Sequence, residues 1–112
     1  MDTAVEARGD ITVVRIMGSI DGTTAEQLMQ VFSGRLSSGE RRLVAALEAV
    51  DYTSSAGLRV LLSTVKEARS GGGDLRLAAP SRDVRKVLEM SGFTTILKVF
   101  DDVDAAVGSF GA

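Results

Sequence analysis

Apolar residues along this chain recur with two spacings, which separate predicted strands from predicted helices. Residues 4–8 and 11–17 carry the short β-rich runs typical of paired strands, with Arg8-Gly9-Asp10 as the turn between them. The segment Gly18-Ser19-Ile20-Asp21-Gly22 then interrupts the strand pattern. This beginning of the chain therefore predicts a β-hairpin.

The next segment predicts a helix that ends at Ser37-Ser38-Gly39. Thr23 and Glu26 have the spacing of a capping box, in which two side chains bond the free N–H groups at a helix start. The residues that follow form one apolar stripe at helical spacing: Ala25, Leu28, Met29, Phe32 and Leu36.

The middle of the chain predicts a buried strand at 43–47 and a long helix that begins near Ser55 and is closed by Gly71-Gly72-Gly73. The apolar face of this helix consists of Leu58, Leu61, Leu62, Val65 and Ala68. Its solvated face consists of Arg59, Ser63, Lys66, Glu67 and Ser70.

The last third predicts two more strand–helix pairs. Residues 74–79 and 96–100 are the predicted strands. A short helix starts at Pro80-Ser81 and ends at Gly92, with Val84, Val87, Leu88 and Ser91 facing inward. Asp101 is the predicted cap of a terminal helix that carries Val103, Ala106, Val107 and Phe110.

The predicted element order is β-β-α-β-α-β-α-β-α, which defines the fold class. One hairpin supplies an antiparallel strand pair, and the βαβ units require parallel neighbours. We therefore expect an α/β fold with a mixed four- to five-stranded sheet and about four helices packed against it. At 112 residues the chain is long enough for a single core, so residues 1–112 are predicted to form one domain.

Composition removes several classes of function. The chain has no His and no Cys, so the commonest general base, thiolate nucleophiles and zinc–thiolate sites are absent. A formal net charge of −2 argues against a nucleic-acid binder, and an aromatic content of 4% offers no platform for stacking bases. No stretch has the length of a membrane span or the pattern of a signal peptide. We expect a cytoplasmic protein that is not an enzyme and needs no cofactor or metal.

Three consecutive hydroxyl side chains, Thr53, Ser54 and Ser55, lie at the predicted junction between the central strand and the long helix. Helix capping explains one of them, because Ser and Thr are common N-caps. The first turn of a helix also has free N–H groups and the positive end of the helix dipole, which suit a negative charge. The junction is therefore a candidate cap and a candidate anion position.

The segment Tyr52-Thr53-Ser54-Ser55-Ala56-Gly57-Leu58-Arg59-Val60-Leu61 resembles the signature of the STAS domain family, specifically the bacterial anti-sigma factor antagonists. The resemblance implies that Ser55, two places before the glycine, is phosphorylated by a partner kinase. Many members have an aspartate immediately before that serine, where this chain has Ser54, so Ser54 is the second choice of acceptor. The family fold agrees with the predicted sheet and helices.

The same resemblance implies a wider site. Asp21 follows the second strand at the position of a family aspartate beside the phosphoacceptor, where it could orient the serine hydroxyl; the alternative is a turn-forming carboxylate. The surroundings of the phosphosite and the partner-binding surface are predicted to include Asp21, Thr23, Thr53, Ser54, Ala56, Gly57, Leu58 and Arg59. Lys66 and Met90 are further candidates for partner contacts.

The leading functional hypothesis is an interaction protein that is switched by phosphorylation. Its unmodified form would bind an anti-sigma factor that is also a serine kinase, and so release a sigma factor or another captive regulator. The kinase would bind ATP and phosphorylate Ser55, and a PP2C-type serine phosphatase would reverse the modification. The alternative is a STAS subunit of a transporter or lipid-export complex without a switch. An acyl enzyme using Ser63 and Lys66 is a third class, but the other motifs of such enzymes are missing.

Overall fold

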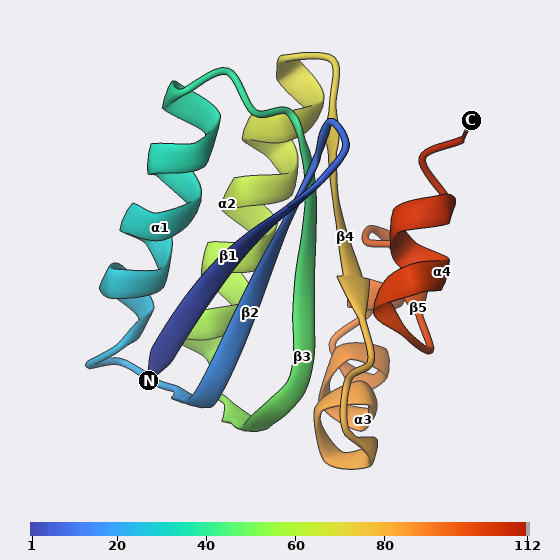
Figure 1. Cartoon of the computed structure of the whole chain (residues 1–112). Coiled ribbons are helices and arrows are strands. Elements are labelled where there is room, and N and C mark those ends of the chain that lie inside the picture. Colours follow the sequence, from blue (N-terminus) through green and yellow to red (C-terminus); the bar gives the residue numbers. More distant parts are fainter. Residues whose placement is uncertain (112) are drawn as a thin grey trace.

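The computed structural model describes residues 1–111, so the predicted domain end at Ala112 lies outside the described part. Its five-stranded sheet has the order β1-β2-β3-β4-β5 (Figure 1). The strands are β1 (Asp2–Arg8), β2 (Ile11–Ile20), β3 (Arg42–Thr53), β4 (Asp74–Ala78) and β5 (Val99–Phe100). β1 runs antiparallel to β2, and the pairs from β2 to β5 are parallel. The predicted mixed sheet is confirmed.

Helices cover both faces of this sheet unequally. The helices are α1 (Ala25–Ser37), α2 (Ser55–Ser70), α3 (Arg82–Met90) and α4 (Val103–Gly108), with a 3₁₀ turn at Phe93–Thr95. α1, α2 and α3 contribute to the larger apolar core on one face, and α4 closes a smaller core on the other. Figure 1 shows α1 and α2 side by side along the sheet, with α4 apart from them. The predicted element order is therefore confirmed.

The long helix begins where the sequence predicts. α2 starts at Ser55, and its residues Leu61, Val65 and Ala68 are buried in the main core or beside it. Leu62 is only partly buried, so its prediction as a core residue was wrong. Leu62 lies at the border of the apolar stripe, where the neighbouring elements cover only part of its side chain.

Three strands are longer than predicted, and the first of them, β1, begins at Asp2 instead of residue 4. β2 continues through Gly18 to Ile20, and β3 continues from the predicted 43–47 to Thr53. Gly18 adopts a φ of +100° at a register shift between the two strands. A left-handed φ is accessible to glycine, so the irregularity bends the pair without ending it. Ile20 is thereby buried in the core rather than placed in a loop.

Two predicted helix caps are wrong. Thr23 does not cap α1, because its hydroxyl donates to Asp21 Oδ1 at 2.7 Å and Thr24 is the N-cap. The carboxylate of Asp21 is a stronger acceptor than a hydroxyl, and it takes the Thr23 N–H that a capping box would use. At α4 the cap is Asp102, whose Oδ1 accepts from Ala105 N at 2.7 Å.

The end of the chain departs from the prediction in two places. The predicted strand 96–100 is reduced to Val99–Phe100, because β4 pairs with β5 only through Leu77 and Ala78. Residues 93–95 form the 3₁₀ turn instead. α4 ends at Gly108, so Phe110 lies beyond the helix, where the guanidinium of Arg76 stacks 4.0 Å from its ring centroid.

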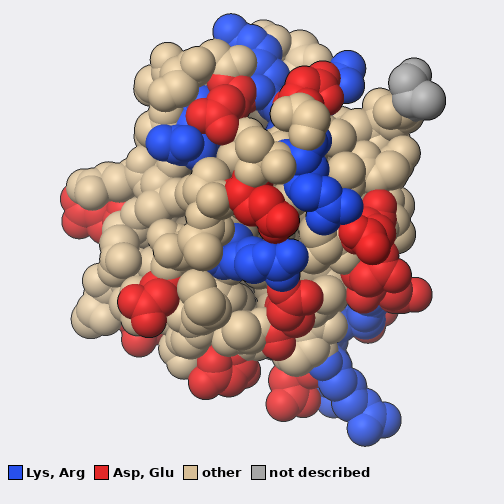
Figure 2. Space-filling view, viewed as in Figure 1, with Lys and Arg blue, Asp and Glu red and all other residues tan. Residues whose placement is uncertain are grey.

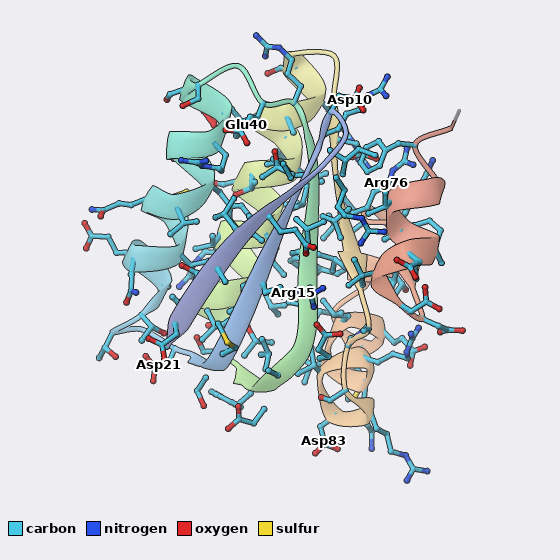
Figure 3. All side chains as sticks on the ribbon, viewed as in Figure 1. Asp10, Arg15, Asp21, Glu40, Arg76 and Asp83 are labelled. Atoms are coloured by element: carbon cyan, nitrogen blue, oxygen red, sulfur yellow. The ribbon has the colours of Figure 1, made fainter. Side chains whose placement is uncertain are left out.

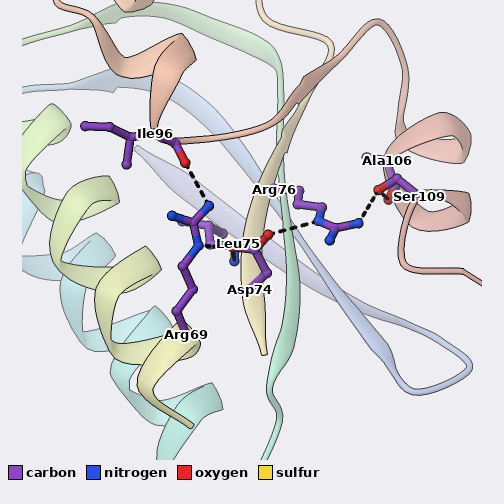
Figure 4. A network of polar contacts seen from close by, with 7 residues as sticks. All are labelled: Arg69, Asp74, Leu75, Arg76, Ile96, Ala106 and Ser109. Atoms are coloured by element: carbon purple, nitrogen blue, oxygen red, sulfur yellow. Dashed lines mark hydrogen bonds and ion pairs between the residues drawn. The ribbon is translucent and has the colours of Figure 1, made fainter. Parts of the chain in front are cut away.

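A network centred on Asp74 joins elements from both faces (Figure 4). This buried carboxylate accepts from Arg69 Nε of α2 at 2.8 Å and from Arg76 Nε of β4 at 3.0 Å. Arg76 also donates to Ser109 Oγ at 2.8 Å, and Arg69 donates to the carbonyl of Ile96 at 2.7 Å. Because both cations share one buried anion, the network fixes α2, β4 and the residues after α4 relative to one another.

Candidate functional site at the carboxyl edge of the sheet

Several residues of the site predicted from the sequence lie where β2 and β3 end side by side. Ile20 and Thr53 are partners in the parallel ladder, and Ser54 N donates to Ile20 O at 2.8 Å just beyond it. The residues that follow the two strands, Asp21 and Ser55, therefore leave the same edge of the sheet. Figure 3 shows Asp21 at this edge, at the opposite end of the sheet from the β1–β2 turn at Asp10.

The three hydroxyls at the start of α2 have different environments. Thr53 is buried, and its hydroxyl donates to Ser54 O at 3.3 Å. Ser54 is the N-cap, and its Oγ accepts from Gly57 N at 3.4 Å. Ser55 is the first helical residue, is exposed, and makes no side-chain hydrogen bond within residues 1–111. Within residues 1–111 the Ser55 hydroxyl therefore has no partner, while Ser54 has the capping role.

The electrostatics of the α2 start favour an anion. The helix has 16 residues, so the peptide dipoles align over a long axis, and no acidic residue lies in its first turn. Several first-turn N–H groups have no intrahelical partner. A negative charge attached to Ser55 would therefore lie near the positive end of α2.

Gly57 allows α2 to begin this close to the sheet. A Cβ at this position would lie 2.3 Å from Thr53 Oγ1 and 2.8 Å from Ile20 Cγ2. Real Cβ atoms essentially never come that close to another heavy atom. The glycine therefore sets how tightly the junction packs on the end of β2, and with it the position of Ser55.

Replacing Gly57 by alanine is expected to destabilise the protein by roughly 1–3 kcal/mol, because the new methyl group must displace Thr53 or Ile20. Urea denaturation measures the loss. Gly34→Ala is the control, because a Cβ at Gly34, also inside a helix, meets nothing within 4 Å. Equal stability of the two variants would contradict the packing role of Gly57.

Asp21 organises the turn that precedes α1. Its Oδ1 accepts from Thr23 Oγ1 at 2.7 Å, Thr23 N at 2.8 Å and Thr24 N at 3.2 Å. These donors, the Thr23 hydroxyl first, lower the pKa of Asp21 below its ordinary value, because they stabilise the ionised form. The turn-forming interpretation of Asp21 is therefore realised, and its second carboxylate oxygen has no hydrogen bond within residues 1–111.

The other predicted site residues divide by exposure. Arg59 and Lys66 are exposed on α2, and Ala56 is partly exposed. Leu58 is 9% exposed and belongs to the core, so little of its side chain is available to a partner. Its position at helical spacing with Leu61 and Val65 explains this burial.

Tyr52 and Met90 are exposed apolar side chains. Tyr52, for which the sequence predicts no specific role, is the second-last residue of β3 and is 54% exposed. Met90, at the end of α3, is 79% exposed.

Charges on the surface seen in Figure 2 are mixed in sign, with no large continuous basic area on that face. Within residues 1–111, no group of three or more acidic residues has the arrangement of a metal site. None of the helices in this part of the chain is both long and apolar enough to span a membrane. The shared features of the site are thus one free hydroxyl, one ionised carboxylate and a helix N-terminus.

Comparisons with known proteins agree on one family. A model of the STAS domain matches residues 2–106. BtrV of Bordetella bronchiseptica, assigned as an anti-sigma factor antagonist, is 40% identical over 95 residues, which are 85% of this chain and 82% of that protein.

Solved structures show the same fold. An anti-sigma factor antagonist from Mycobacterium paratuberculosis is 26% identical, with 96% of this chain and 92% of that chain covered and a TM-score of 0.89. The anti-sigma factor antagonist SpoIIAA in its unphosphorylated form is 22% identical, covers 97% and 96% of the two chains, and has a TM-score of 0.83. The phosphorylated form of SpoIIAA from Bacillus is 21% identical, covers 98% and 100%, and has a TM-score of 0.76.

Proposed function

Because this chain belongs to the STAS domain family, we propose that it is a partner-switching regulator whose binding is controlled by phosphorylation of Ser55. The similarity to anti-sigma factor antagonists supports an anti-sigma factor as its partner. Unmodified protein binds this partner in the cytoplasm and releases the sigma factor or other regulator that the partner holds. The chain contributes a binding surface and a substrate hydroxyl, and it catalyses nothing itself.

The observation that carries this proposal is the difference between the two serines. Ser54 has an intramolecular partner for its hydroxyl, whereas Ser55 is exposed and has none within residues 1–111. A kinase must reach the oxygen that attacks the γ-phosphorus of ATP, and it must do so without unfolding the helix start. Ser55 meets both requirements.

Asp21 supports the same assignment. Its carboxylate is held ionised at the shared edge of β2 and β3, with one oxygen taken by Thr23 and Thr24 and the other without a partner in the described residues. We propose that this free oxygen orients the Ser55 hydroxyl or a metal ion carried by the nucleotide of the kinase. ATP and its metal ion belong to the kinase, and a PP2C-type phosphatase restores the unmodified serine.

Phosphorylation by the cognate anti-sigma kinase with ATP is expected to modify Ser55 alone. Ser55→Ala should abolish phosphate incorporation. Ser54→Ala should still be phosphorylated, at a lower rate or with a less stable helix start, because it loses the cap of α2. Mass spectrometry of the modified peptide identifies the acceptor. A phosphate found on Ser54 alone would overturn the assignment, and a chain that no such kinase modifies would favour the STAS subunit of a transporter or lipid-export complex.

A further inference from the structure

β1 forms an open edge of the sheet. It has seven residues, Asp2–Arg8, and within residues 1–111 it pairs with β2 alone. Five of its residues are exposed, the strand contains no proline, and its ladder with β2 has no register shift. Natural edge strands are usually shortened, bulged or blocked by proline, because their free N–H and C=O groups can pair with another strand. β1 has none of these three devices, and the only guard it has is the charge of Asp2, Glu6 and Arg8.

Val5 adds an apolar surface to this edge. It lies opposite Val14, which belongs to the main core, and it is nevertheless 46% exposed. The neighbouring Thr3 and Ala7 are on the same side of the strand as Val5, because side chains alternate. This side of β1 thus presents small apolar and hydroxyl groups at an uncovered boundary of the core.

The charges of β1 discriminate among the ways in which two copies could pair. In an antiparallel pair, residues that point their N–H and C=O groups toward the partner strand lie opposite residues that do the same. When two copies of the same strand pair in this way, one residue must therefore lie opposite the same residue of the second copy. The two-fold axis passes between these two residues, and each possible register is named below by that residue. An axis at Ala4 places Asp2 opposite Glu6 of the second copy, and an axis at Glu6 places this residue opposite itself. Both registers bring like charges together, which is destabilising.

An axis at Val5 has the opposite result. It places Asp2 opposite Arg8 of the second copy at both ends of the pair, and it places Val5 against Val5. All seven residues of the strand then have a partner. An axis at Ala7 also pairs opposite charges, Glu6 with Arg8, but it uses only three strand residues before the turn at Gly9.

We propose that β1 is a self-association edge, on which a second copy of this chain pairs in the antiparallel register centred on Val5. The two sheets then form one continuous ten-stranded sheet, in which the two-fold axis is perpendicular to the strands. The carboxyl edges of the two copies lie at opposite ends of this sheet, so both Ser55 residues stay accessible. The inference does not depend on the switch, because β1 contains none of the residues of that site.

Sedimentation velocity of the full chain over a range of concentrations at low salt tests this dimer. We expect a reversible monomer–dimer equilibrium that weakens as salt is added, because the end pairs are exposed. Asp2→Arg and Arg8→Asp should each weaken association roughly tenfold or more, since each variant converts both end pairs into like charges. Asp83→Arg, an equal change of charge on exposed α3, should associate like the unmodified chain.

Two further combinations of these substitutions test whether the strands pair in the register centred on Val5. The double variant with Asp2→Arg and Arg8→Asp should recover dimerisation. An equimolar mixture of the two single variants should form a heterodimer, because each end then again joins opposite charges. Arg8 also bonds Asp104 at 2.7 Å, so Asp104→Asn controls for the loss of that ion pair and should leave the dimer intact. Circular dichroism verifies that each variant is folded.

Three results would overturn the inference. One is a chain that stays monomeric up to about 1 mM, at which point any self-affinity is too weak to matter and the edge is free for an extended segment of a different protein. Another is a dimer that is insensitive to the single substitutions. The third is a failure of both the double variant and the mixture to recover association.

Discussion

Phosphorylation of Ser55 is expected to weaken binding to the anti-sigma factor more than a hundredfold while leaving the fold unchanged. The phosphate adds about −1.5 to −2 charges at neutral pH. Within this chain the new charge faces the first turn of α2, which contains no acidic residue and has free N–H groups. At the interface the same charge must be desolvated without a partner, and a penalty of about 3 kcal/mol already corresponds to more than a hundredfold in affinity.

Isothermal titration calorimetry with unmodified, phosphorylated and substituted chains measures this effect. Ser55→Asp should lose part of the affinity, because one carboxylate carries less charge and a different shape, and Ser55→Ala should bind like the unmodified chain. Ser63→Asp is the matched control, because Ser63 is exposed on the same helix but lies more than two turns beyond the junction. Equal affinities of the phosphorylated and unmodified chains would show that the switch is wrong.

Leu61→Ala is expected to cost roughly 2–5 kcal/mol of unfolding free energy, because it leaves a cavity in the main core. Leu61 is 2% exposed and belongs to the cluster that joins α2 to the sheet. Urea or thermal unfolding followed by circular dichroism gives the value.

Leu62→Ala is the matched comparison for this substitution. It removes the same atoms from the next position of the helix, but Leu62 is only partly buried, so the loss should be clearly smaller. If both variants lost the same free energy, or if Leu61→Ala lost less than about 1 kcal/mol, the assignment of the buried face of α2 would be wrong.

Much of the fold follows from local pattern. The spacing of Leu61, Val65 and Ala68 identified the buried face of α2, and the glycines after it marked its end, because a helix and a strand repeat their inward positions with different periods. The caps were less predictable. Thr23 and Asp101 both had suitable side chains, but a stronger acceptor at Asp21 and a better-placed carboxylate at Asp102 took the N–H groups.

The sequence by itself determined the element order, the candidate segment around Ser55 and the absence of His and Cys, since these depend on residue identity and local spacing. Only the tertiary structure decided which hydroxyl is free, because capping by Ser54 depends on the residue at which α2 begins. It also decided that Gly57 lies against Ile20, that Leu58 is buried and that β1 is the open edge. These facts depend on contacts between residues far apart in the chain, and no local periodicity encodes which segments become neighbours.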